Sequence, residues 1–170
     1  GALYVHKERF SYKGQNIFFA SNYHLARYIE GFSPSKVNKL VNLFAVLGFV
    51  EKVPIEFIHP ALMEKTAKIR NRRNLANTIG FYIVYPFEQV SDIAAKRAEI
   101  LLKEGIRYSN LSKALIEDVF GEGFAQAVYV QEIQKNKHNP QKKAAFLYEV
   151  FEHRFQSLLE QNGYVTKSMI

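Results

Sequence analysis

The sequence of 170 residues contains no cysteine and no tryptophan. A chain without cysteine has no disulfide, no thiolate ligand for zinc and no cysteine nucleophile. Long apolar runs are missing as well, and none approaches the roughly 18 consecutive residues that predict a membrane helix. The first residues also lack the layout of a signal peptide. We therefore expect a cytoplasmic protein with no membrane partner, and Gly1 in place of Met suggests a piece of a longer protein.

Acidic residues are scarce in the first half of the chain. Residues 1–90 contain 12 Lys and Arg against 6 Asp and Glu, whereas residues 91–170 contain 11 against 10. The net charge of +7 therefore comes almost wholly from the first half. A positive surface of this size favours nucleic acid as a partner. The alternative is a soluble basic surface that binds none.

The first half alternates between strand and helix patterns. Strands are expected at 17–20, 49–53 and 81–85, and helices at 22–30, 33–47 and 61–74. Lys13 to Asn16 reads as a turn. The apolar stripe of the first helix includes Leu25 and Tyr28. Ser33 and Pro34 suit the start of the second helix, and Gly48 suits its end.

From Ser91 onward the pattern is nearly all helical. Helices are expected at 91–104, 109–120, 124–136 and 141–161, with Ser91 and Ser109 as N-caps and a polar linker at 135–140. The predicted fold class is therefore α+β, mostly α. It comprises a winged helix-turn-helix domain at 1–88, with a helical insertion near the wing, and a helical domain at 89–170. A second unit of helix-turn-helix type is an alternative for that second domain.

The winged helix-turn-helix prediction comes from the order of the elements. Two short helices joined by Gly31-Phe32-Ser33 match the helix-turn-helix pattern, and a strand pair after the second helix adds the wing. The second helix of this motif enters the major groove. Its outward positions are expected to be Ser35, Lys36, Asn38, Lys39 and Asn42.

These outward residue types suit DNA. Asn can pair with adenine, and Lys can contact guanine or phosphate. None of the five is acidic, and the helix N-terminus can itself approach a phosphate. The alternative is a solvated helix face in a winged helix that binds protein.

The helix at 61–74 is the second candidate DNA contact. Its cations are Lys65, Lys68, Arg70, Arg72 and Arg73, against the single carboxylate Glu64. Such a cluster suits a phosphate backbone. Favourable interaction with the helix dipole accounts for one or two of these cations, but not for all five.

Aromatic residues offer a different reading. The aromatic residues that could stack on the bases of a single strand are Phe18, Phe19, Phe44, Phe49, Phe81, Tyr82 and Tyr85. Most of them occupy alternating strand positions or helical core positions, which favours core packing instead.

Two segments carry a family resemblance. The run Ile17-Phe18-Phe19-Ala20-Ser21-Asn22 and the segment from Ser35 to Pro54, SKVNKLVNLFAVLGFVEKVP, resemble winged-helix regions of replication proteins from Gram-positive mobile elements. Those regions are similar to ones that accompany primase-type zinc-finger domains. The shared order is a helix, LLxxLG(F/L)(V/I)xK(V/I)P, a lysine-rich wing helix and a strand, over roughly residues 17–86. The resemblance implies DNA binding in replication or its control, with any priming chemistry outside this chain, which lacks zinc-finger cysteines.

Enzymatic motifs are missing from the sequence. No phosphate-binding glycine loop or nucleophile elbow occurs. Glu149 and His153 have helical spacing, but nothing supplies a third and fourth metal ligand. Glu117 and Asp118 have ordinary charged surroundings. We therefore expect no catalytic residue, no metal and no cofactor.

The functional prediction is a module that binds duplex DNA in replication or a mobile element. The alternative is a protein-protein interaction module of a replication or transcription-control assembly. In that case the apolar side of the helix at 141–161 would contact a partner or form a homodimer.

Overall fold

The computed structural model describes residues 17–73, 79–130 and 140–166. The chain divides into two compact units, Gly1–Glu99 (unit 1) and Ile100–Ile170 (unit 2). The division falls within helix α5 (Phe87–Lys103), which begins just before the expected boundary at residue 88 and continues past it. The turn at 13–16, and all but Pro140 of the linker at 135–140, lie outside the described residues.

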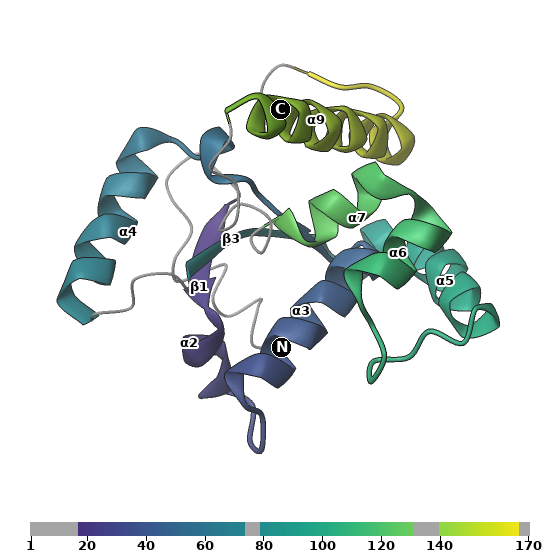
Figure 1. The fold of residues 1–170 in the computed structure, drawn as a ribbon, viewed down its shortest axis with the longest axis horizontal. Helices are drawn as coiled ribbons and strands as arrows, with labels where there is room; N and C mark the ends of the chain where they lie inside the picture. The colour runs from purple at the N-terminus through teal and green to yellow at the C-terminus, as the bar shows by residue number, and fades with distance from the viewer. Residues whose placement is uncertain (1–16, 74–78, 131–139, 167–170) are drawn as a thin grey trace. The chain divides into compact units, whose positions relative to one another are not determined.

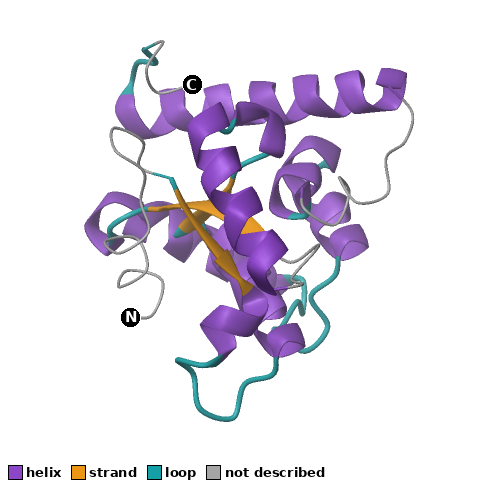
Figure 2. Cartoon of the chain, turned by 90° about the vertical axis from the view of Figure 1, so that its left-hand side faces the viewer, coloured by secondary structure: helices purple, strands orange, loops and turns teal. Residues whose placement is uncertain are grey.

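The predicted coarse fold class is confirmed, because the described residues form mainly helices and a small antiparallel sheet. Unit 1 contains the three strands β1 (Phe18–Ser21), β2 (Val50–Lys52) and β3 (Ile79–Val84). Their order is β1-β3-β2, so that β3 lies in the middle. Figure 2 shows these strands in orange.

The helices of unit 1 are α2 (Asn22–Ala26), α3 (Pro34–Leu47), α4 (Pro60–Arg73) and the first part of α5, with a short 3-10 turn, η1 (Ile55–Phe57), before α4. The prediction that the first helix reaches residue 30 is wrong. After Ala26 the backbone tightens, and Tyr28 N donates to Leu25 O three residues back. The aromatic and β-branched side chains that follow are weak helix formers.

Side chains alternate across the sheet and form two apolar clusters. Phe18 and Tyr82 face the side that α2 and α3 cover, whereas Phe19 and Phe81 face the side that the start of α4 covers. Figure 1 shows α3 and α4 on opposite sides of the strands. All four aromatic residues are buried, which confirms their core packing.

Specific contacts fix both ends of α3. The Ser33 hydroxyl accepts a hydrogen bond from Lys36 N, and Pro34 occupies the first turn. Gly48 ends the helix in the left-handed region, with φ at 92°. Arg97 of α5 donates from Nη1 to Val46 O at 3.1 Å, which satisfies a carbonyl of the last turn.

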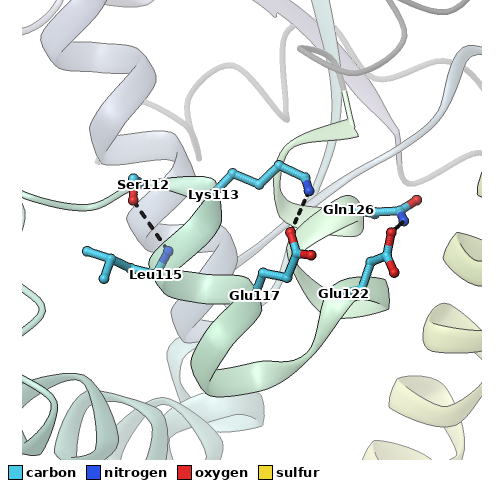
Figure 3. Close-up of polar contacts among 6 residues, drawn as sticks. All are labelled: Ser112, Lys113, Leu115, Glu117, Glu122 and Gln126. Carbon is cyan, nitrogen blue, oxygen red and sulfur yellow. Dashed lines mark hydrogen bonds and ion pairs between the residues drawn. The ribbon is translucent and has the colours of Figure 1, made fainter.

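Unit 2 is helical in its described part, with α6 (Lys113–Phe120), α7 (Glu122–Val128) and α9 (Pro140–Asn162). Phe120 and Phe124 pack with ring centroids 4.9 Å apart. Close to the break between α6 and α7, side-chain bonds join residues four apart along each helix (Figure 3). None of the helices in the described segments has the length and apolar character needed to cross a membrane.

Two predicted N-caps are wrong. Ser112, not Ser109, caps α6, because Asn110 closes a loop by accepting from Arg107 N and donating to Gly105 O. Ser91 lies inside α5, whose backbone turns already at Pro86, where Gln89 N bonds to Pro86 O.

Replacing Gly48 by alanine should destabilise the protein by about 2 kcal/mol. The alanine would have to adopt a positive φ, and its Cβ would lie 3.3 Å from Arg97 Nη1. Gly31→Ala is the matched control, because Gly31 also has positive φ but has no atom within 4 Å of its Cβ position. In urea unfolding the control should lose less unfolding free energy, about 1 kcal/mol. Equal losses would contradict a role for the Arg97 contact.

Candidate nucleic-acid interface

The outward face of α3 is confined to its first two turns. Ser35, Lys36 and Lys39 are exposed there, whereas Val37 and Val41 are buried in the core. The Lys36 ammonium lies 5.8 Å from the Phe32 ring centroid. The helix carries no Asp or Glu at any position. The core therefore supports this short basic face from behind, and α3 itself contributes no carboxylate to it.

Asn38 lies at the edge of that face and is half-buried. Its Oδ1 accepts a hydrogen bond of 3.0 Å from Nδ2 of Asn22, the first residue of α2. The side chain is thus oriented by a second helix.

The prediction that Asn42 faces outward is wrong. Asn42 is 4% exposed, and its Oδ1 accepts from Nζ of Lys52, which is 3% exposed on β2. A buried ammonium group requires acceptors, because loss of its hydration is costly. Asn42 supplies one, so it faces the sheet, and the pair ties α3 to the edge strand.

One of the described cations of α4 is paired with the carboxylate of the same helix. Lys68 Nζ lies 2.7 Å from Glu64 Oε1, and both side chains are exposed. The hydrogen bond from Lys68, and then its charge, lower the pKa of Glu64. Lys65 Nζ lies 6.0 Å from the Phe19 ring centroid. The side chains of Arg70, Arg72 and Arg73 lie outside the described residues.

Lys65 and Lys36 belong to opposite sides of the sheet, since Phe19 faces away from α3. Arg73 precedes Ile79 by six positions, so their Cα atoms are at most about 20 Å apart. Ile79 pairs with Ser21, the residue that caps α2. Arg73 therefore lies within about 20 Å of the strand residue that pairs with the α2 cap.

Sequence reasoning missed three exposed residues around α2. Tyr23 is 58% exposed and Tyr28 49% exposed, and Arg27 between them is exposed as well. Helical spacing had placed Tyr28 in the core, but the helix ends before it. Tyr and Arg side chains are common donors to phosphate. The sequence gives no sign that α2 ends at Ala26, because the apolar stripe continues past that residue.

Of the two pairs considered for chemistry in the second half, Glu117 and His153 make ordinary side-chain contacts. Lys113 Nζ donates to Glu117 Oε2 at 2.7 Å (Figure 3). The His153 ring packs edge-on against Phe124, with centroids 5.1 Å apart. Within the described segments, no group of three or more His, Asp or Glu residues comes together in a way that could hold a metal ion.

Lys52→Met should destabilise the protein by about 1–3 kcal/mol, because it removes the donor to the buried Asn42. The double variant Asn42→Leu, Lys52→Met should lose about 1 kcal/mol less than the sum of the single losses. Lys113→Met is the control, because it breaks a half-exposed pair worth about 0.5 kcal/mol. If the losses of unfolding free energy measured with urea are strictly additive, the Asn42 and Lys52 side chains are not coupled.

Comparison of the chain with models of protein families, with curated proteins and with solved structures finds no match. The interpretation of this surface therefore depends on its own geometry and chemistry.

Proposed function

We propose that unit 1 is a DNA-binding module of the winged helix-turn-helix type that docks α3 on duplex DNA. The observation that carries the proposal is the first two turns of α3, where Lys36 and Lys39 are exposed on a helix without carboxylates. Neutralising phosphates with such cations releases counterions and supplies most of the non-specific affinity for DNA.

The order of the elements supports this type. In the order β1-α2-α3-β2-β3, two helices joined by a short turn are followed by the antiparallel strand pair β2 and β3. In this arrangement η1 and α4 stand between β2 and β3, where a wing would lie. An α-helix with its side chains is about 10–12 Å across, so α3 can enter a groove roughly 12 Å wide.

Residues around α3 would contact the phosphate backbone. Tyr23, Arg27 and Tyr28 offer donors beside α3, and the cations of α4 offer a second group. Such contacts position a protein without reading sequence. Lys68 would exchange its bond to Glu64 for a phosphate, whereas Lys65 lies on the side of the sheet away from α3 and is not part of this surface.

The proposed role is binding without catalysis, in the replication of a mobile element or its control. The support for that process is the resemblance of residues 17–86 to winged-helix regions of replication proteins. A cytoplasmic location belongs to the same proposal.

Lys36→Glu combined with Lys39→Glu should weaken duplex binding at least about tenfold, because two phosphate or base contacts become repulsive. Fluorescence anisotropy with a labelled duplex, titrated at several salt concentrations, measures the effect. The control is Lys96→Glu with Lys103→Glu, which makes the same charge change at two exposed positions of α5. An equal loss of affinity in both double variants would show that the effect comes from net charge alone. Absence of wild-type binding at about 50 mM salt would refute the proposal.

A second candidate function is self-association through α9. Tyr148 and Leu159 are 67% and 39% exposed on this helix. Eleven residues correspond to about three helical turns, so both lie on one side of α9. Tyr148 and Leu159, about 16 Å apart along that side, would both contact a second copy of the same helix.

Tyr148→Glu with Leu159→Glu should convert a dimer to a monomer, because charge on this side opposes burial. Light scattering coupled to size-exclusion chromatography measures the mass. Gln156→Glu, also exposed on α9, is the control and should leave the mass unchanged. A wild-type chain that stays monomeric at every protein concentration measured would exclude this function.

A further inference from the structure

An exposed aromatic ring and a cation lie next to each other on α2. Tyr23 is the second residue of this helix and is 58% exposed. Arg27 ends the helix with helical backbone angles, φ −66° and ψ −20°, and is exposed as well. Since residues four positions apart are neighbours on a helix surface, the Tyr23 ring and the Arg27 guanidinium group share one side of α2.

That side of α2 belongs to the same outer surface as the basic side of α3. Leu25 of α2 and Val37 of α3 pack in one apolar cluster, so the two helices cover the same face of the sheet. Tyr23 and Arg27 each lie about 160° around the helix from Leu25, and Lys39 lies about 160° from Val37. Both helices therefore turn these exposed side chains away from the sheet.

A contact between the two helices brings these groups close together. The side chains of Asn22 and Asn38 are joined by a hydrogen bond of 3.0 Å. Tyr23 and Lys39 are the next residues along the two helices, so each is one position away from this contact. Glu30 is the only carboxylate residue in the sequence from 17 to 50. An exposed ring thus lies among cations on a surface with little negative charge.

Tyr23 can contact DNA through its hydroxyl or through its ring. A hydroxyl can bond to a phosphate of any duplex, but this contact would leave the ring in water. Stacking on a base would bury the ring, and burial of apolar area is favourable. Within the described residues no ring packs against Tyr23, so the ring is accessible to a base.

Stacking requires a base whose face is uncovered. The bases of an intact duplex are covered by their neighbours, whereas the first base beyond the end of a duplex is not. Proteins that bind single strands combine such aromatic rings with cations that follow the phosphates. The Tyr23 ring beside Arg27 offers this combination at the edge of the surface that α3 presents.

We propose that Tyr23 stacks on the first unpaired base of a DNA duplex that continues as a single strand, so that unit 1 binds this junction. The inference rests on the proposed docking of α3 on duplex DNA. In this arrangement α3 contacts the duplex, Arg27 contacts a phosphate of the single strand, and Tyr23 covers the base that leaves the stack. The contact tolerates any sequence, because every base has a face that can stack.

Fluorescence anisotropy of the full chain with labelled DNA probes tests the inference. The probes are a blunt duplex, the same duplex with a 3′ or a 5′ thymine extension, and the extended strand alone. The wild type should bind the duplex with one of the two extensions about tenfold more tightly than the blunt duplex, the gain expected for one stacked base. It should bind the strand alone more weakly than that extended duplex.

Variants of Tyr23 separate its ring from its hydroxyl. Tyr23→Leu should lose the gain from the extension, whereas Tyr23→Phe keeps the ring and should retain the gain. An abasic first position in the extension keeps the phosphates, so it should remove the gain in the wild type and change nothing in Tyr23→Leu. Phe87→Leu is the matched control and should retain the gain, because Phe87 is 65% exposed but stacks on Phe49 beyond the other end of α3.

The outcomes separate the inference from its premise. Equal wild-type affinity for blunt and extended duplexes, or a gain that Tyr23→Leu retains, would overturn the inference and leave duplex binding intact. A gain that Tyr23→Phe loses would also overturn it, because the hydroxyl would then make the contact. Binding of the strand alone as tightly as the extended duplex would contradict recognition of a junction. Failure of the wild type to bind any duplex would refute the proposed function itself.

Discussion

Burial of β3 on both faces is the constraint on which unit 1 depends. This central strand pairs with β1 on one side and β2 on the other, and Phe81, Tyr82, Ile83 and Val84 are all buried. A three-stranded sheet with two apolar faces needs a layer on each side. Since α2 and α3 form one layer and the start of α4 forms the other, the inner side of α3 is fixed. The outward side of α3 follows from that requirement.

Polar contacts then set the position of α3 more finely. Lys52 ties its middle to the edge strand through Asn42, and Arg97 binds a carbonyl near its end. Asn22 holds Asn38 near its beginning. A helix held at three points presents its exposed residues with little freedom, and such preorganisation lowers the entropic cost of binding a rigid partner.

The sequence predicts α3 well because its signals are local. Ser33, Pro34 and Gly48 mark its ends, and the spacing of Val37 and Val41 marks its core side. The strands are predicted within two residues at each end for the same reason. The exposure of Lys36 and Lys39 follows directly from that spacing, since they lie away from the valines.

Other features depend on partners distant along the chain. Asn42 is polar and was expected outside, but its environment is decided by Lys52. The start of α6 depends on the loop that Asn110 closes. The Asn22 side chain donates to Asn38, 16 positions away. Periodicity contains no information about such pairs, because a polar side chain suits either solvent or a buried partner.

The most direct test of the central claim is to map amide chemical shifts of the 170-residue chain during titration with a mixed-sequence duplex at low salt. Docking through α3 predicts that the largest and most salt-sensitive changes occur at residues 34–39, with smaller ones around Tyr23 and Arg27. Changes confined to unit 2, or none at a saturating duplex concentration, would contradict the account.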